Sequence, residues 1–415
     1  MPPAYRRRLN PALSIRPLVY APRRLINIAV VGAALALGGG AAAFAQTAQK
    51  AAGGYETKAP RAILMDSGAD LVLYEKDADT QFIPASMSKL MTLALVFREL
   101  KAGRIKLEDG FNVSEYAWRT GGAPSKTSAM FAPLNTAVPV DELIQGVTVQ
   151  SGNDACIILA EGIAGSEEAF VKMMNDHAKE IGLTQSHFAN SNGLPAEGHV
   201  MSARDLAILA KHLIDTYPEY YHYFGQKEFK YREKFTFRNR NPLVWADIGV
   251  DGLKTGHLKE SGYGLVASGK RGDQRLIVVV AGLETANDRE SEARKMLEWG
   301  FKSFKPFRLF NEGVKVSDAL VWGGTQHYVP LVGNGNIDLL LPASATGAVS
   351  ASIIYDGPIK APIRKGDQIA TLRVNAAESS ATNEIPLYAG EDIGQSNFAM
   401  RGIDSLLVLA FGWLL

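Results

Sequence analysis

Three short motifs carry residue types suited to nucleophilic chemistry: Ser86-Met87-Ser88-Lys89, Ser151-Gly152-Asn153 and Lys254-Thr255-Gly256. Residues three positions apart on a helix share a face, so the amine of Lys89 would lie beside the hydroxyl of Ser86. A serine hydroxyl attacks a carbonyl only when such a neighbouring base takes its proton. Ser86 alone could be a simple helix N-cap. The three motifs together indicate an acyl-transfer site with Ser86 as its nucleophile.

The surroundings of Ser86 agree with this role. The apolar run from Leu90 to Val96 predicts a helix that begins close to the serine. A helix N-terminus presents free backbone N–H groups and the positive end of its dipole. Both would stabilise the negative charge that develops on a carbonyl oxygen under attack.

The other two motifs are expected on different elements. The segments 262–268 and 276–281 are rich in β-branched and apolar residues, and they predict a β-hairpin whose first strand begins near Lys254. Ser151-Gly152-Asn153 joins two short helical stretches, 141–149 and 155–161. A loop between helices can direct its side chains into a cleft, so we expect the three motifs to meet there.

The ordered motifs resemble those of the penicillin-recognising serine enzymes. Within that group, the chain resembles the low-molecular-mass penicillin-binding proteins that are D-alanyl-D-alanine carboxypeptidases. The resemblance also rests on segments at 118–122, 202–207, 239–243 and 250–253, on Asn192-Gly193-Leu194-Pro195 and on C-terminal stretches at 319–324 and 357–363. It implies an α+β fold: a β-lactamase/transpeptidase-like domain, with an antiparallel sheet flanked by helices, followed by a small all-β domain and a C-terminal amphipathic helix.

The resemblance implies a mechanism for the three motifs. Ser86 would attack the D-Ala-D-Ala peptide bond, and Lys89 would take its proton as a neutral amine. Burial and the charge of Lys254 would lower the pKa of Lys89. Ser151 would relay a proton to the departing nitrogen, while Asn153 would hold Lys89 and the substrate backbone.

Substrate recognition is assigned to further residues by the same resemblance. The backbone N–H groups of Ser86 and His257 would form an oxyanion hole. Thr255, Gly256 and Arg240 match substrate-binding positions. Thr255 and Arg240 would bind the free carboxylate of the leaving D-alanine, and Lys254 would add to the positive electrostatic potential there. The alternative for Arg240 is a surface arginine in a turn at 239–242.

The first 45 residues predict a signal peptide. They contain six arginines and no acidic residue, then an apolar run from Leu25 to Leu37 and a small-residue end at Ala43-Phe44-Ala45. A membrane anchor is the alternative, but the run is shorter than the ~20 residues that cross a bilayer. We expect cleavage after residue 45 and export to the periplasm.

The remaining ~370 residues suggest two domains by length. Residues 58–306 mix strands and helices, whereas 307–395 contain β-branched runs punctuated by Gly and Pro, typical of a small β-sandwich. Residues 396–415 predict an amphipathic helix, and the resemblance implies that it lies on the periplasmic face of the inner membrane. Packing on protein is the alternative for this helix.

Charge and composition exclude other classes of function. The formal net charge is +1, and removal of the six N-terminal arginines leaves −5, which argues against a nucleic-acid partner. The single cysteine, Cys156, lies in an apolar stretch and is expected to be buried and inert. The seven histidines show no metal-ligand spacing, so we expect no metal and no cofactor.

The predicted function is therefore removal of the terminal D-alanine from peptidoglycan stem pentapeptides, with β-lactam antibiotics acylating the same serine. A serine β-lactamase is one alternative; Glu197 could activate its deacylating water, but Met201 stands where the pattern E-x-x-x-N requires asparagine. A non-catalytic β-lactam sensor or wall-binding protein is the other alternative, although no motif residue is missing.

Overall fold

The computed structural model describes residues 54–342, 349–376, 382–398 and 401–402. The described chain divides into two compact units, Tyr55–Lys302 and the residues from Ser303 onward. The predicted signal peptide and most of the predicted C-terminal helix lie outside the described residues. Within the described residues, no helix combines the length and apolar character that a membrane crossing requires.

The first unit is built on a five-stranded antiparallel sheet in the order β2-β1-β9-β8-β7. Its N-terminal hairpin therefore pairs, through β1, with the strand β9, which lies some 200 residues later in the chain. The strand β7 lies at the edge, so one side of its backbone has no partner strand. The strands are β1 (Arg61–Asp66), β2 (Leu71–Lys76), β7 (Val250–Leu258), β8 (Gly262–Arg271) and β9 (Gln274–Leu283).

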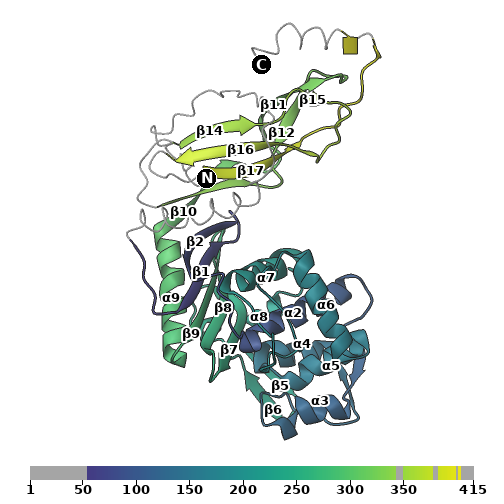
Figure 1. Ribbon diagram of the computed structural model, residues 1–415, viewed down its shortest axis with the longest axis vertical. Helices are drawn as coiled ribbons and strands as arrows, with labels where there is room; N and C mark the ends of the chain where they lie inside the picture. Colours follow the sequence, from purple (N-terminus) through teal and green to yellow (C-terminus); the bar gives the residue numbers. More distant parts are fainter. Residues whose placement is uncertain (1–53, 343–348, 377–381, 399–400, 403–415) are drawn as a thin grey trace, which may run out of the picture. The chain divides into compact units, whose positions relative to one another are not determined.

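Helices cover both faces of this sheet (Figure 1). On one face lies α9 (Ala286–Ser303), whose Gly300 fits closely against Leu64 and Leu276 of the sheet. The other face carries a helical layer around α2 (Lys89–Lys101), which is buried on almost all sides because its residues are apolar nearly all round. That layer also contains α3 (Glu115–Thr120), α4 (Val140–Gln145), α5 (Asn153–Ala164), α6 (Glu167–Glu180), α7 (Ala203–Thr216) and α8 (His222–Gly225).

Short elements connect the helices and shape the region beside β7. Single turns of helix occur at η1 (Ala85–Ser88), η2 (Ala123–Ser125), η3 (Gly146–Gln150) and η4 (Pro242–Trp245). Two small hairpins pair β3 (Gly110–Asn112) with β4 (Ala137–Pro139) and β5 (Glu228–Tyr231) with β6 (Phe235–Arg238).

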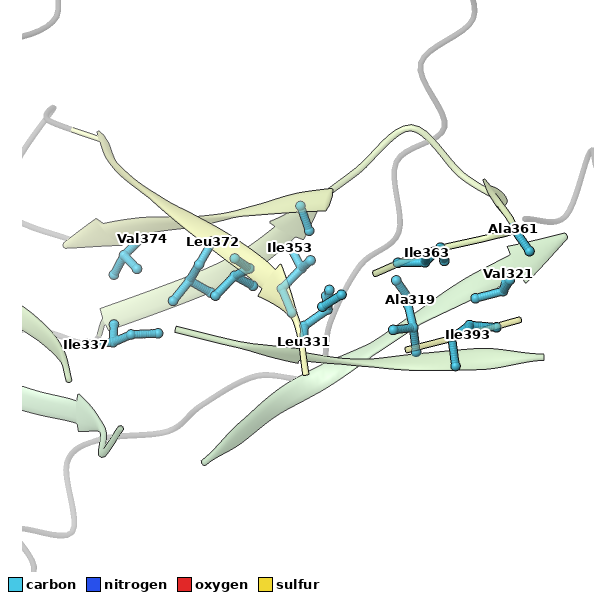
Figure 2. Packing of buried hydrophobic residues seen from close by; sticks show 14 residues of the cluster. Ala319, Val321, Leu331, Ile337, Ile353, Ala361, Ile363, Leu372, Val374 and Ile393 are labelled. Carbon is cyan, nitrogen blue, oxygen red and sulfur yellow. The ribbon is translucent and has the colours of Figure 1, made fainter. Parts of the chain in front are cut away.

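The second unit consists of strands throughout its named elements. A six-stranded sheet has the order β14-β16-β17-β12-β11-β15, and a two-stranded sheet pairs β10 with β13. Both sheets contribute to one apolar cluster, to which β13 adds Ile337 and β11 adds Val321 (Figure 2). The strands are β10 (Phe304–Phe310), β11 (Lys315–Trp322), β12 (Tyr328–Val332), β13 (Ile337–Pro342), β14 (Val349–Ile354), β15 (Ile359–Lys360), β16 (Gln368–Ala376) and β17 (Thr382–Ala389).

The predicted α+β fold followed by an all-β unit is confirmed, and one local expectation needs correction. The hairpin predicted from 262–268 and 276–281 is present as β8 and β9. Lys254, however, does not begin its first strand; the residue lies in the middle of a further strand, β7, which pairs with β8. The motif is thus held rigidly within the sheet.

Candidate active site

The predicted nucleophile lies on a helical turn that leads into the central helix. Ser86 belongs to η1, and Lys89 is the first residue of α2. Lys89 Nζ donates a hydrogen bond to Ser86 Oγ across 2.8 Å and a second one to the carbonyl oxygen of Asn192. The serine is half-buried and Lys89 is fully buried, so the amine reaches the hydroxyl from inside the protein.

Burial changes the acidity of Lys89. Its pKa falls from 10.5 to about 8, mainly because burial disfavours the ammonium form. Among the nearby charges, Arg240 lowers this pKa further, while the Cys156 and Asp154 side chains raise it. The sequence-based expectation named Lys254 as the charge that lowers this pKa together with burial, whereas in the structure that charge is Arg240. A minor fraction of the amine, about a tenth, is therefore neutral at pH 7, and this fraction grows as the pH approaches 8.

The second and third motifs meet at a second lysine. Ser151 lies at the junction of η3 and α5 in a left-handed conformation, with a φ of 63°. Lys254 Nζ, from β7, donates a hydrogen bond to Ser151 Oγ across 2.9 Å. Burial, followed by the charges of Lys89 and Arg240, holds the pKa of Lys254 well below its usual range. Both hydroxyls of the site thus have a buried amine as donor.

A glycine lets β7 pass directly over the nucleophilic turn. A Cβ atom on Gly256 would lie 2.8 Å from the carbonyl oxygen of Pro84, closer than side chains normally approach backbone. The last residue of the Lys-Thr-Gly motif is therefore required for the contact between β7 and η1. This contact brings the third motif to the serine.

The loop 190–194 forms a part of the site that the side-chain types did not predict. Gly193 has a φ of +78°, and a Cβ atom on it would lie 2.2 Å from the carbonyl oxygen of Ala85. Two hydrogen bonds fix the loop to the helices α2 and α6. Thr92 Oγ1 donates to the Ser191 carbonyl, and Ser191 N donates to Glu167 Oε1. Its contribution to Lys89 is a backbone carbonyl, which side-chain types cannot reveal. The glycine of Asn192-Gly193 was the available signal for a close approach.

One of the two contacts expected of Asn153, the one with Lys89, is absent. Its Nδ2 donates to Thr127 Oγ1 across 2.8 Å, and its backbone N–H donates to the carbonyl of Ser128 across 2.7 Å. The predicted contact with Lys89 is not formed. Asn153 Oδ1 is buried and accepts no hydrogen bond from the described part of the chain. A buried acceptor without a donor is costly, which suits a position that a ligand N–H would satisfy.

Arg240 is exposed, as the surface-turn alternative expected, but it is joined to the site. Its Nη1 donates to Ser128 Oγ across 2.8 Å, so Ser128 links the arginine to Asn153. Thr255 and His257 follow Lys254 on β7; the threonine is buried, whereas the imidazole is exposed and stacks on Tyr263 with ring centroids 3.9 Å apart. Eight of the nine predicted site residues thus lie on η1, α2, α5, β7 and the junction of η3 with α5, and the ninth, Arg240, lies between β6 and η4.

Two other residues considered in the sequence, Cys156 and Glu197, lie in positions typical of residues that take no part in catalysis. Cys156 is fully buried in α5, and burial raises the pKa of its thiol to about 12. Glu197 is exposed on a loop. In the described residues no group of three or more His, Cys, Asp or Glu side chains is arranged to hold a metal ion.

Comparison with known proteins assigns both units. A family model described as D-alanyl-D-alanine carboxypeptidase matches residues 45–285, and one described as penicillin-binding protein 5, C-terminal domain, matches 304–395. The D-alanyl-D-alanine carboxypeptidase DacA of Escherichia coli is 35% identical over 354 residues, covering 85% of this chain and 87% of the relative.

Solved structures agree with these matches. Penicillin-binding protein 5 from Haemophilus influenzae superposes with a TM-score of 0.76 at 35% identity, covering 82% of this chain and 99% of that one. Penicillin-binding protein D2 from Listeria monocytogenes, in its ampicillin-bound form, gives a TM-score of 0.52 at 28% identity, covering 60% and 99%. The chain therefore belongs to the D-alanyl-D-alanine carboxypeptidase family of serine-type hydrolases.

Proposed function

We propose that Ser86, Lys89 and Ser151 carry the reaction of this carboxypeptidase on peptidoglycan stem pentapeptides. The carboxypeptidase activity itself follows from the family and from the named relatives. The observation that carries the residue assignment is the buried Lys89 amine, 2.8 Å from Ser86 Oγ, with a pKa of about 8. An amine so placed can accept the serine proton during attack.

Acylation begins when Ser86 Oγ attacks the carbonyl carbon of the D-Ala-D-Ala bond. Its proton passes to Lys89, and negative charge gathers on the carbonyl oxygen. The start of the helical segment at Ser86 and the free edge of β7 at His257 supply backbone N–H groups for that oxygen. Each such donor contributes ~3 kcal/mol to the transition state.

Departure of D-alanine needs a proton on its nitrogen. Ser151 Oγ is the proposed donor, because it accepts a hydrogen bond from Lys254 and can therefore direct its own proton toward the cleft. Water then hydrolyses the ester at Ser86. The proton held by Lys89 and one proton of the attacking water return to Ser151 and Ser86, and the enzyme is regenerated.

Substrate placement rests on β7 and two polar groups. The open edge of β7 can pair with an extended peptide as an added strand. Asn153 Oδ1 would accept a peptide N–H, which removes its unsatisfied state. Thr255 and Arg240 would bind the terminal carboxylate of the substrate, since an arginine suits carboxylate geometry.

We also propose that β-lactams acylate Ser86. The Listeria relative has been crystallised in ampicillin- and cefotaxime-bound forms, and its chain is matched over nearly its whole length. A β-lactam carbonyl would be attacked by the same serine, and its ester would resist water because the leaving amine remains tethered.

Export to the periplasm and attachment to the outer face of the inner membrane are part of the same proposal. They are supported by the arginine-rich, apolar and Ala-x-Ala pattern of residues 1–45 and by the apolar face of residues 396–415. Fractionation of cells expressing the full chain and a chain ending at residue 395 tests the attachment. Equal release of both forms by a mild salt wash would contradict it.

The test of the enzymatic proposal is release of D-alanine from diacetyl-Lys-D-Ala-D-Ala. The wild type should release it, while Ser86→Ala and Lys89→Ala should not. Labelling by a fluorescent penicillin with no D-alanine release would instead favour a β-lactam sensor. Rapid, sustained turnover of penicillin would favour a β-lactamase.

A further inference from the structure

A basic groove lies beside the candidate active site, and of its lining residues only Arg240 has a role in the mechanism above. Its volume is about 480 Å³, and it runs between the segment from β6 to η4 and the helix α9. Three arginines line it: Arg238 and Arg240 from the first wall and Arg294 from α9. One acidic side chain, Glu290, faces them and pairs with Arg294 across 3.1 Å.

An aromatic side chain, Trp245, positions one of these arginines. The guanidinium of Arg238 stacks over the ring of Trp245 at 4.2 Å. Trp245 is itself fixed, because its Nε1 donates to the carbonyl of Asn239 across 3.1 Å. A stacked guanidinium keeps part of its edge available for a carboxylate, and Arg238 is restrained by this stacking in addition to its ion pair with Glu228. Glu228 approaches it only at 3.6 Å on the exposed side.

Arg240 connects the groove with the catalytic cleft. It lines the groove, donates to Ser128 Oγ and lowers the pKa of Lys89 by its charge. In the proposed function it binds the carboxylate of the residue that leaves. A side chain on that residue longer than the methyl group of alanine would therefore extend from Arg240 into the groove.

We propose that the groove binds an acidic side chain on the leaving D-amino acid, so that the enzyme also cleaves D-alanyl bonds to acidic D-residues. This inference rests on the proposed function of Ser86 and Arg240. The chemistry is unchanged: the D-alanyl C–N bond breaks, the ester to Ser86 forms, the leaving amine gains a proton, and water completes the hydrolysis. Arg294 pairs with Glu290 and Arg238 with Glu228, so the three arginines outnumber the acidic side chains around them by one. This net positive charge attracts an anion and discriminates against a neutral side chain of equal size.

The test compares substrates that differ only in the charge of the leaving side chain. Diacetyl-Lys-D-Ala-D-Glu and diacetyl-Lys-D-Ala-D-Gln have nearly the same shape, and diacetyl-Lys-D-Ala-D-Ala reports the basal reaction. We expect kcat/KM for the D-Glu substrate to exceed that for D-Gln by about threefold to tenfold at low salt, the range for exposed charge-assisted contacts. The ratio should fall toward one in ~0.5 M NaCl, where such contacts are screened.

Variants assign the effect to the groove. Arg294→Ala and Arg238→Gln should each reduce the D-Glu to D-Gln ratio. Lys295→Ala is the matched control, since it removes an equal charge from the same helix at a residue that pairs with Glu292 outside the groove. Its ratio should match that of the wild type.

Two failures are distinguishable. If D-alanine is not released from the basal substrate, the proposed function is wrong. If D-alanine is released but D-Glu is no better than D-Gln, or the ratio survives both arginine variants, only the groove inference is overturned. Penicillin labelling of each variant checks that its site is folded.

Discussion

The two units differ in what they bury. Every buried polar or charged residue of the described chain lies between Thr57 and Glu292, in the first unit. They include two lysines, Lys89 and Lys254, each no more than 2% exposed. The apolar cluster of the second unit contains only Ala, Val, Leu and Ile.

This difference shows that the first unit buries polar side chains that its chemistry uses and that lower its stability. An apolar core is stabilised by each methyl group it buries, about 25 cal/mol per Å². A buried amine instead loses its hydration, and it is tolerated when it has hydrogen-bond partners and can become neutral. The second unit has no such groups in its described core.

The largest expected effect is on catalysis alone. Ser86→Ala should reduce D-alanine release by a factor on the order of 10⁴ or more, because the covalent route is removed. Its melting temperature should stay close to that of the wild type, since the hydroxyl is half-buried and its partner Lys89 keeps the Asn192 carbonyl. Residual release within tenfold of the wild type would transfer the nucleophile to another residue.

A matched substitution in the second unit should do the opposite. Leu331→Ala removes a fully buried side chain from the apolar cluster and should lower the unfolding free energy of that unit by about 2–4 kcal/mol. Turnover of a small soluble peptide should be unchanged, as every candidate site residue is in the first unit. Calorimetry and the D-alanine assay measure the two quantities. A large loss of kcat would contradict the expectation that the core of the second unit affects stability without affecting catalysis.

Replacement of the buried base should stabilise the first unit while inactivating it. The pKa of Lys89 is about 8 in the folded chain and 10.5 in the reference state, so the unfolded state binds more protons between these values. The loss of folding stability caused by burying the Lys89 ammonium is therefore fully present below pH 8. It is relieved as the pH rises toward 10.5. Lys89→Met should gain about 1–2 kcal/mol at pH 7, net of two lost hydrogen bonds, and show a weaker rise in stability with pH.

Denaturant unfolding at pH 7 and pH 10 measures both quantities. The stability difference between Lys89→Met and the wild type should shrink at the higher pH. A variant that is less stable at pH 7 would show that the lysine contributes more through packing and hydrogen bonds than it costs by desolvation.

A further prediction for the first unit is the pH dependence of the wild type. Since Lys89 must be neutral to accept the serine proton, kcat/KM should fall about tenfold per unit below pH 8 and level off above it. Initial rates with diacetyl-Lys-D-Ala-D-Ala between pH 5.5 and about 9 measure the profile. A rate that is flat down to pH 6 would contradict the assignment of Lys89 as the base.

Much of the site could be predicted because its chemistry is carried by side-chain types in recognisable order. Ser86 and Lys89 share one helical turn, so their contact follows from local geometry. The position of Lys254 inside β7 could not be predicted, since the apolar signal of 262–281 describes β8 and β9 and not the strand before them.

The amino-acid sequence by itself determined the nucleophile, its neighbouring amine, the family resemblance and the change from mixed to all-β structure near residue 306. Only the tertiary structure decided which partners the polar groups take: the Asn192 carbonyl for Lys89, Thr127 for Asn153 and Ser128 for Arg240. The reason is physical. A side chain's type determines what it can donate or accept, whereas its partner depends on which distant backbone or side-chain groups the fold brings within 3 Å. Glycines such as Gly193 and Gly256 permit the close approach of backbone segments.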